Sequence, residues 1–325
     1  MITIFKAPDR DFTILNLTDT HLTNEEWVEG HPFRRIFTTT VHSLIERVHP
    51  DMITITGDLT MVDNVESYEM LADFIESFEI PWSIVWGNHD NENPPEVIAK
   101  AVESFHKRKH FLYESGDPSL GNGNYVIKIE ENGRPVTSLI MMDSHETIWI
   151  PNANGVMERV YAKLIPEQLD WYREQVKQLK QLGYNESMLM MHIPIHAYVQ
   201  AFAAAFNNDF DLNDVRNNHP EVFANEACWK DGYKESTGVY LEDAGCYPFD
   251  DGVFEVVKEM NHTRYIVSGH EHRNTFMIPY QGVQFIYSLK TGPSAYWQPD
   301  INGGTVIRIS SNGICDVHHE FVDAQ

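Results

Sequence analysis

The first third of the chain alternates short apolar runs with amphipathic stretches. Three runs have the length and the β-branched or apolar composition of strands: 12–18, 52–56 and 82–86. The two stretches between them, 33–48 and 65–79, repeat apolar residues at helical spacing, and Pro50 ends the first helix. The order strand, helix, strand, helix, strand is typical of a layered α/β fold, in which ligands bind at the carboxyl ends of the strands.

The remainder of the chain predicts further strands, two helices and a strand-rich end. Asn132-Gly133 separates the apolar runs 125–129 and 136–142, as a hairpin turn does. Pro166 begins a helix over 167–182, and Gly183 ends it. The other predicted elements are strands at 187–191 and 264–267, a helix at 253–260, and a strand-rich segment at 275–322 with a hairpin at Asn312-Gly313.

Residues 198–250 interrupt this pattern, because they are rich in Asn, Asp and aromatic residues and show no clear period. An irregular loop of this length is usually functional or contains unrecognised elements. No repeat, low-complexity segment or linker divides the chain, so we predict a single domain over 1–325 in which 198–250 is an insertion and a candidate substrate cap. Trp229, Tyr233 and Tyr240 could stack on a base or sugar, and packing within the loop is the alternative.

Charge and cysteine content exclude several classes of protein. The formal net charge of −24 opposes binding to nucleic acid, which requires clustered Lys and Arg. No apolar run is long enough to span a membrane, and the start lacks the pattern of a secretory signal. Cys228, Cys246 and Cys315 are too widely spaced for a disulfide framework or a zinc knuckle. We therefore expect a cytoplasmic protein that binds neither nucleic acid nor membrane.

Polar residues that bind metals follow five of the predicted strands. They are Asp19 and His21, then Asp58, then Asn88, His89 and Asp90, then His192, and finally His270 and His272. Each group alone has an ordinary explanation as a turn, a cap or a buried histidine. Together they offer the mixture of imidazole and carboxylate that suits Mn, Fe or Zn. Two ions about 3.5–4 Å apart require a bridging carboxylate and about three further ligands each, which this set can supply.

The ordered set of motifs resembles the calcineurin-like metallophosphoesterase superfamily, and the segments around His192 and Gly269–Asn274 are similar to its purple-acid-phosphatase-like branch. The resemblance implies a four-layer αββα sandwich and two divalent metal ions that share Asp58. The implied ligands are Asp19, His21, Asp58 and His272 for one ion, and Asp58, Asn88, His192 and His270 for the other. Purple acid phosphatases carry a metal-binding Tyr where this chain has Met61. A purple colour is therefore not expected, and iron in the first site is in question.

The resemblance also implies a role for His89, which is not a metal ligand in the family but faces the leaving group. The expected reaction is hydrolysis of a phosphoester by metal-activated hydroxide, with His89 protonating the leaving oxygen. Asp90 either orients His89 or caps the turn. His145, His196 and Arg35 are weaker candidates for contacts with substrate, and packing or surface roles are the alternative for each.

Three functions are compatible with these residues. The first is hydrolysis of a small phosphomonoester, and the second is a phosphodiesterase acting on cyclic nucleotides or nucleotide-diphosphate compounds. The third is a scaffold of the same fold without catalysis. Because every expected ligand position and His89 are filled, the sequence favours an enzyme with a small phosphorylated substrate.

Overall fold

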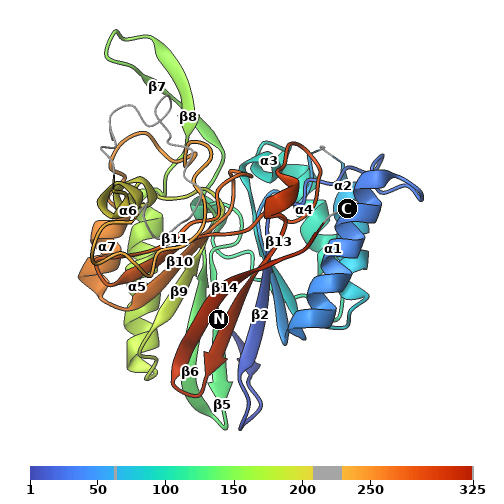
Figure 1. Cartoon of the computed structure of the whole chain (residues 1–325), viewed down its shortest axis with the longest axis horizontal. Helices are drawn as coiled ribbons and strands as arrows, with labels where there is room; N and C mark the ends of the chain where they lie inside the picture. Colours follow the sequence, from blue (N-terminus) through green and yellow to red (C-terminus); the bar gives the residue numbers. More distant parts are fainter. Residues whose placement is uncertain (62–63, 208–228, 324–325) are drawn as a thin grey trace.

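Two β-sheets face each other at the centre of the protein (Figure 1), as seen in a computed structural model that describes residues 1–61, 64–207 and 229–323. Within these residues the larger sheet has seven strands in the order β1-β5-β6-β9-β10-β12-β11. Their bounds are β1 Ile2–Phe5, β5 Tyr125–Glu131, β6 Arg134–Met141, β9 Ser187–Met190, β10 Thr263–Ser268, β11 Met277–Tyr280 and β12 Val283–Tyr287.

The smaller sheet has five strands in the described part of the chain, in the order β14-β13-β2-β3-β4. Their bounds are β2 Phe12–Leu17, β3 Met52–Thr56, β4 Trp82–Val85, β13 Gly303–Ser310 and β14 Gly313–Phe321. Strands β2, β3 and β4 are parallel, as are β6, β9, β10 and β12 in the larger sheet. The loops that follow these strands therefore gather at one edge of the sandwich.

Helices cover the outer face of each sheet (Figure 1). Those beside the smaller sheet are α1 Pro32–Val48, α2 Val65–Glu76 and α4 Pro95–Phe105, and those beside the larger sheet are α5 Pro166–Gln181, α6 Ala197–Ala205 and α7 Val253–Met260. The short helix α3, Asn88–Asn91, follows β4. None of the described helices has both the length and the apolar character needed to cross a membrane.

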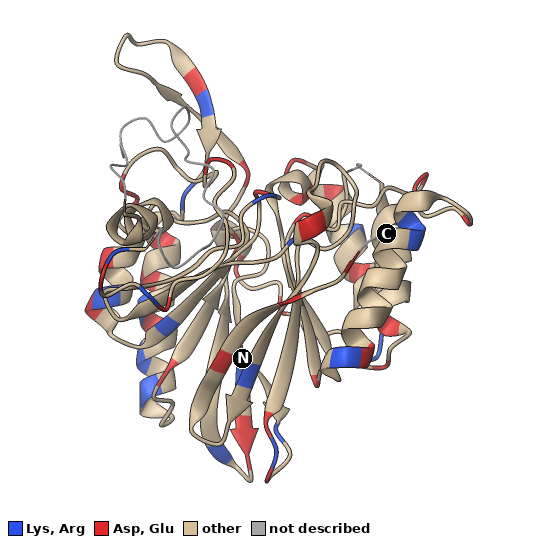
Figure 2. Ribbon diagram, in the orientation of Figure 1, with Lys and Arg blue, Asp and Glu red and all other residues tan. Residues whose placement is uncertain are grey.

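Side-chain alternation in the larger sheet produces the four layers. Successive residues of a strand point to opposite faces. Ile127 and Leu139 therefore pack in a core shared with the smaller sheet and its helices, whereas Val126 and Ile140 pack in a second core with α5, α6 and α7. The predicted αββα arrangement is confirmed. Figure 2 shows that Asp, Glu, Lys and Arg lie mainly on helices, loops and sheet edges, outside these cores.

Two elements differ from the sequence expectations. Helix α6 lies inside the stretch that was expected to be irregular; most of its residues are buried, so it lacks the polar face that reveals an amphipathic helix. A two-stranded hairpin of β7, Thr147–Pro151, and β8, Met157–Tyr161, was not predicted. It extends beyond the edge of the sandwich at which the parallel strands end (Figure 1).

Candidate metal centre

The seven predicted metal ligands meet at the edge where the parallel strands end, with residues from both sheets. Each ligand lies shortly after β2, β3, β4, β9 or β10, in the following loop or, for Asn88, at the start of α3. All seven side chains are buried: Asp19, His21, Asp58, Asn88, His192, His270 and His272. Their donor atoms form two adjoining groups.

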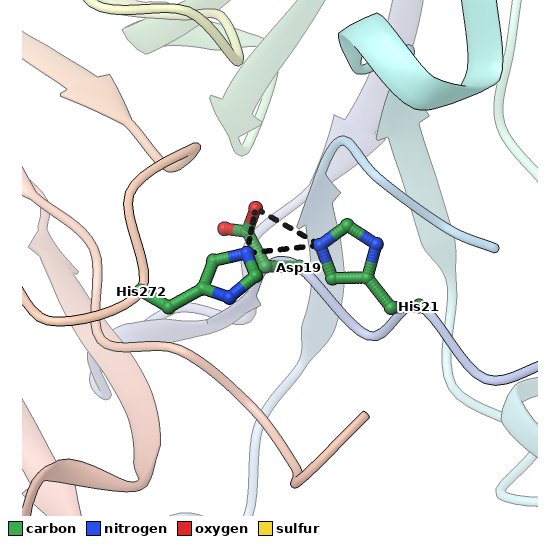
Figure 3. Close-up of side chains that lie close together, drawn as sticks. All are labelled: Asp19, His21 and His272. Carbon is green, nitrogen blue, oxygen red and sulfur yellow. Dashed lines mark hydrogen bonds and ion pairs between the residues drawn. The ribbon is translucent and has the colours of Figure 1, made fainter. Parts of the chain in front are cut away.

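The first group consists of Asp19, His21 and His272 (Figure 3). The Asp19 Oδ1 atom lies 3.7 Å from His21 Nε2 and 3.5 Å from His272 Nε2. The two Nε2 atoms are 2.9 Å apart. These three donors therefore converge on one point.

The second group consists of Asp58, His192 and His270, with Asn88 beside it. The His192 Nε2 atom lies 3.2 Å from Asp58 Oδ2, 3.1 Å from Asn88 Oδ1 and 3.2 Å from His270 Nδ1. The same Asp58 Oδ2 atom is 3.5 Å from His21 Nε2, which belongs to the first group. Asp58 thus occupies the position between the groups that a bridging carboxylate requires.

Hydrogen bonds on the outer side of the rings fix their orientation. His192 Nδ1 lies 2.8 Å from the Thr56 carbonyl oxygen, and His272 Nδ1 lies 2.6 Å from that of Tyr296. A ring that donates from Nδ1 keeps the lone pair of Nε2 free for a metal, as in known metal sites. The buried Asp19 Oδ1 has no hydrogen-bond partner among the described residues. Two groups of inward-facing lone pairs around an unsatisfied carboxylate oxygen fit two divalent ions.

The backbone of the ligand loops adopts left-handed conformations, which side chains larger than glycine rarely occupy. The φ angles are 54° at Asp19, 55° at His21, 51° at Asp58 and 94° at His270. The amide of Asp19 donates to the Gly57 carbonyl, and that of His21 donates to the Asp58 carbonyl, at 3.1 and 3.0 Å. Strain of this kind persists where surrounding bonds impose it and is concentrated at functional sites.

Burial and neighbouring charges separate the proton affinities of the imidazoles. Burial, with the charge of Lys290, lowers the pKa of His21 to about 3, and burial together with His192 lowers the pKa of His270 to about 3. Burial also acts to lower the pKa of His192, but the carboxylates of Asp58 and Asp19 outweigh it and raise that pKa to about 9. His21 and His270 thus stay neutral and able to donate lone pairs, as does His272, whose pKa burial also lowers. A metal at the second group would displace the Nε2 proton of His192.

The two carboxylates are held ionised. Burial acts to raise the pKa of Asp19 and of Asp58, but nearby imidazoles hold both pKa values below the usual range. His192 has the largest opposing effect at each carboxylate; the His21 and His272 rings add to it at Asp19, and the His21 ring adds to it at Asp58. An ionised carboxylate is the form that binds a metal.

Glycines in two of the motifs allow the loops to approach one another. A Cβ atom at Gly87 would lie 2.1 Å from Asp58 Oδ1 and 2.2 Å from its backbone nitrogen. At Gly57, where φ is +87°, a Cβ atom would lie 2.4 Å from His192 Nδ1. Both distances are far shorter than van der Waals contact, which explains why glycine precedes Asp58 and Asn88.

His89 lies beside the ligands and borders a hollow. Its amide donates to Asp58 Oδ1 at 3.0 Å, and its ring lies 5.5 Å from the ring of His21. The side chain is 37% exposed and lines a hollow of about 330 Å³ together with Asn88. The ring is therefore open to a molecule bound against the metal ligands.

Asp90 does not orient His89, so that part of the sequence interpretation is corrected. Its carboxylate accepts hydrogen bonds from the Gly87 amide at 2.8 Å, the Leu59 amide at 3.1 Å and the Tyr68 hydroxyl at 3.0 Å. Burial raises the pKa of Asp90 to about 7, and the nearby Asp58 adds to the shift. Asp90 caps the turn, which was the alternative role. The carboxylate beside His89 Nδ1 belongs instead to Glu92, at 3.3 Å.

The three weaker candidates for substrate contacts lie elsewhere. His145 Nε2 is 2.7 Å from Gln168 Oε1, and His145 borders a different hollow. His196 begins α6, with its amide bonded to Asp251. Arg35 is exposed on α1 and borders a hollow beside α2. Within the described residues, none of them lines the hollow beside His89, so contact of each with substrate stays a prediction that this hollow does not support.

The stretch 198–250 has a mixed outcome, and its residues 208–228 lie outside the described part. Trp229 and Tyr240 do not face the hollow; both are buried in the second core, where Tyr240 stacks on Phe202 at 4.2 Å between centroids. Of the two roles that the sequence left open for Trp229 and Tyr240, packing against neighbouring residues is therefore the one that the structure shows. Asp243 and Cys246, in contrast, line the hollow beside His89.

Sequence reasoning also missed the residues of β7 and β8 that border the site. Thr147, Arg159 and Tyr161 line the same hollow, and the Tyr161 ring meets the His270 ring edge-on at 4.2 Å. One signal was present in the sequence, because Asn154-Gly155 is a hairpin turn motif between two short segments, 147–151 and 157–161, that contain β-branched and aromatic residues.

With this geometry in place, the family can be stated. The family model described as "Calcineurin-like phosphoesterase" matches the chain over residues 12–274, which is most of its length. The chain therefore belongs to the calcineurin-like phosphoesterase family, and the resemblance drawn from its motifs is confirmed.

Individual relatives are distant. The chain is 26% identical over 220 residues to Phosphatase DCR2 of Saccharomyces cerevisiae, covering 58% of this chain and 35% of the relative. It is 24% identical over 278 residues to Probable inactive purple acid phosphatase 28 of Arabidopsis thaliana, covering 79% and 62%. The chain thus spans roughly one third and three fifths of these relatives' lengths.

A solved structure of similar fold is purple acid phosphatase PPD1 from yellow lupin (Lupinus luteus) seeds. It has a TM-score of 0.50 at 10% identity, and the match covers 92% of this chain and 49% of that chain. At this identity the likeness supports the fold alone.

Proposed function

We propose that the protein hydrolyses a small phosphomonoester at a centre of two divalent metal ions. The observation that supports this most is the pair of adjoining donor groups linked by Asp58 Oδ2. The proposed ligands are Asp19, His21, Asp58 and His272 for one ion and Asp58, Asn88, His192 and His270 for the other. The ions, which we expect to be Mn, Fe or Zn, supply positive charge for phosphate oxygens and make water acidic enough to react near neutral pH.

The protein's own contribution to the leaving group is assigned to His89. Its ring lines the hollow that adjoins the ligands, so an ester bound there presents its leaving oxygen to the ring. The Glu92 carboxylate, 3.3 Å from Nδ1, favours a proton on that nitrogen and leaves Nε2 to exchange a proton with substrate. General-acid catalysis of this kind contributes about 10²–10⁴-fold to a rate.

A phosphodiesterase is the second candidate, and similarity supports it. Over 83 residues the chain is 29% identical to a Probable cyclic nucleotide phosphodiesterase of Vesicomyosocius okutanii. That match covers 26% of the chain, so it bears on the shared motifs more than on the substrate pocket. A scaffold without catalysis is disfavoured, because all seven ligand side chains and His89 are present and assembled.

The decisive experiment joins metal content with activity. After reconstitution with Mn, Fe or Zn, we expect about two ions per chain by elemental analysis and turnover across a panel of phosphomonoesters and diesters. Asp58→Asn should lose both ions together, because one carboxylate serves two sites. Asp143→Asn is the matched control, since Asp143 is equally buried but bonds to Asn91 and the Asn122 amide instead.

Two results would contradict the proposal. One is wild-type protein that binds no divalent metal, and the other is an Asp58→Asn variant that keeps both ions at wild-type affinity. Faster turnover of diesters than of monoesters would select the second candidate instead.

A further inference from the structure

The hairpin β7–β8 presents one face toward the hollow beside His89. Antiparallel pairing sets Thr147 opposite Tyr161 and Trp149 opposite Arg159. Residues paired in this way, and those two apart along a strand, lie on the same side of the ribbon. Three of the four, Thr147, Arg159 and Tyr161, line the hollow, and Val160, between Arg159 and Tyr161, borders it as well. Trp149 is therefore the next residue outward on the face that borders the site.

The polar groups on this face are available to a phosphoester. Tyr161 packs its ring edge against His270, yet its hydroxyl has no hydrogen-bond partner among the described residues. Arg159 bonds through Nε to Thr147 Oγ1 at 2.7 Å and forms an ion pair with Glu92 through one terminal nitrogen. Its remaining donors are free, since half of the side chain is exposed. Among the described residues lining the hollow, Arg159 is the one with a permanent positive charge.

The outer part of the face is aromatic and open. Trp149 is 64% exposed, which is unusual for an indole, and Arg159 lies directly across from it. Two residues along a strand advance about 7 Å. The Trp149–Arg159 pair lies two pairs beyond the Thr147–Tyr161 pair, so Trp149 is about 7 Å farther out along the hairpin, where the organic part of a nucleotide-sized ester would extend.

The charges around the hollow restrict the substrate further. Glu92 and Asp243 also line it, so additional phosphates on the organic group would meet carboxylates. One anionic phosphoryl group would be matched by the positive charge of the proposed metal ions and of Arg159, whereas a second phosphate would find no further positive charge among the described residues lining the hollow. The organic group that contacts Trp149 should therefore be uncharged and planar.

We propose that this face of β7–β8 is the substrate-recognition element, and that it selects monophosphate esters of planar organic groups such as nucleosides or aryl alcohols. Tyr161 donates a hydrogen bond to the phosphoryl group, Arg159 adds positive charge and holds Glu92 beside His89, and Trp149 stacks on the planar group. This inference rests on the proposed phosphomonoesterase activity and names its substrate class.

The test uses metal-reconstituted full-length protein, with adenosine monophosphate as a planar ester and glycerol phosphate as an aliphatic one. Trp149→Ala should lower kcat/KM for adenosine monophosphate by about 5- to 100-fold, the range for aromatic stacking on a base, and leave glycerol phosphate within about twofold. Ile148→Ala is the matched control. Ile148 is an exposed neighbour on the opposite face of the hairpin, and it should change neither value.

Binding provides a readout that does not depend on turnover. By calorimetry, Trp149→Ala should weaken adenosine monophosphate and leave inorganic phosphate unchanged, whereas Tyr161→Phe should weaken both by about the same factor. Metal content should stay at the wild-type value in each variant, because neither residue is a proposed ligand.

The outcomes separate the two proposals. Wild-type protein that hydrolyses neither ester would overturn the proposed function. Wild-type protein that hydrolyses both, with an unchanged preference in Trp149→Ala, would overturn only this inference. Loss of a dimer in Trp149→Ala, seen by sedimentation velocity with kinetics unchanged, would also overturn it and assign the exposed indole to contact with a second copy of the chain.

Discussion

In the proposed mechanism, one ring nitrogen of His89 protonates the leaving group. The backbone amide of His89 donates to the Asp58 carboxylate, whereas its ring borders the hollow and lies beside Glu92 and the His21 ring. A side-chain substitution should therefore remove the proposed contact with substrate and keep the backbone contact with Asp58.

Replacement of His89 by Gln should lower kcat by about 10²–10⁴-fold for an alkyl phosphate. The loss should be much smaller for nitrophenyl phosphate, whose leaving group needs little protonation. Metal content should remain at about two ions per chain, because the hydrogen bond from the backbone amide of residue 89 to Asp58 is kept. Steady-state kinetics on a series of leaving groups measures this, and equal losses throughout the series would remove His89 from the general-acid role.

Gly87 is a second residue at which a small change should affect the site, because an added Cβ atom would overlap Asp58. Gly87→Ala should displace the Asp58 carboxylate and weaken Mn binding by at least about 10-fold, the scale seen when groups that support metal ligands are changed. Titration calorimetry with Mn measures the affinity.

Gly304→Ala is the control for Gly87→Ala. An added Cβ there would crowd Leu15 at 2.9 Å in the core, away from the ligands. It should lower stability without changing metal affinity. Equal metal affinity in Gly87→Ala and wild type would show that the loop tolerates the displacement.

At the scale of elements, α3 is held in place by one buried carboxylate. Asp90 joins the turn before α3 to the loop after β3 through the amides of Gly87 and Leu59. Both of these loops carry proposed ligands. An element of four residues has little stability of its own, so this carboxylate is the main reason that the two loops keep their relative positions.

Asp90→Asn should therefore reduce the free energy of unfolding by about 1–3 kcal/mol, because the amide group of Asn cannot accept all three bonds. Urea denaturation measures the change. Asp73→Asn is the control, since Asp73 is exposed in an ion pair with Arg108 and should cost less than about 1 kcal/mol. A change in Asp90→Asn no larger than the control would show that the turn does not depend on this carboxylate.

The elements that the sequence predicted well are those whose apolar residues recur at a regular spacing or whose ends are marked by glycine or proline. The strands before Asp19, Asp58 and Asn88 were apparent from their apolar runs, and the site followed because each run ends in a donor. Helix α6 was hidden because burial on most sides leaves no polar face. The sequence left two roles open for Asp90, because its partners Leu59 and Tyr68 lie in the loop after β3 and in α2, far from it along the chain.

The hairpin β7–β8 was missed for a different reason. Its strands are largely exposed and contain polar and apolar residues on both faces, so they lack the buried alternation on which strand prediction depends. The same exposure is what places Trp149 and Arg159 in contact with solvent beside the hollow. Elements that bind substrate are often the least predictable from hydrophobic pattern, since their surfaces are selected for contact with ligand.

At the scale of the whole molecule, the proposed metal ligands come from loops of both sheets. Asp19, Asp58 and Asn88 follow strands of the smaller sheet, whereas His192 and His270 follow strands of the larger one. An ion bound by residues of both sheets would link the sheets at one edge. Its positive charge would offset the repulsion among the clustered carboxylates and ring lone pairs. Metal binding should therefore stabilise the entire fold and not only the loops.

Metal dependence of the melting temperature tests this link. A ligand at 100 times its Kd adds about 2.7 kcal/mol per site, and a chain of this size gains roughly 2 °C per kcal/mol. Saturation of two sites with Mn should then raise Tm by about 10 °C, and a chelator should reverse the rise. Mg should do less at equal concentration, since imidazole-rich sites suit transition metals better.

Asp58→Asn provides the comparison for the melting experiment, because it should lose the metal-dependent rise while keeping the fold of the chelated wild type. Scanning calorimetry at several Mn concentrations distinguishes specific binding, which saturates, from general ionic effects, which also appear in the variant. A wild-type Tm that is independent of Mn, in protein shown to contain two ions, would mean that the ions are bound without linking the sheets. The stability of the sandwich would then come from its two hydrophobic cores alone.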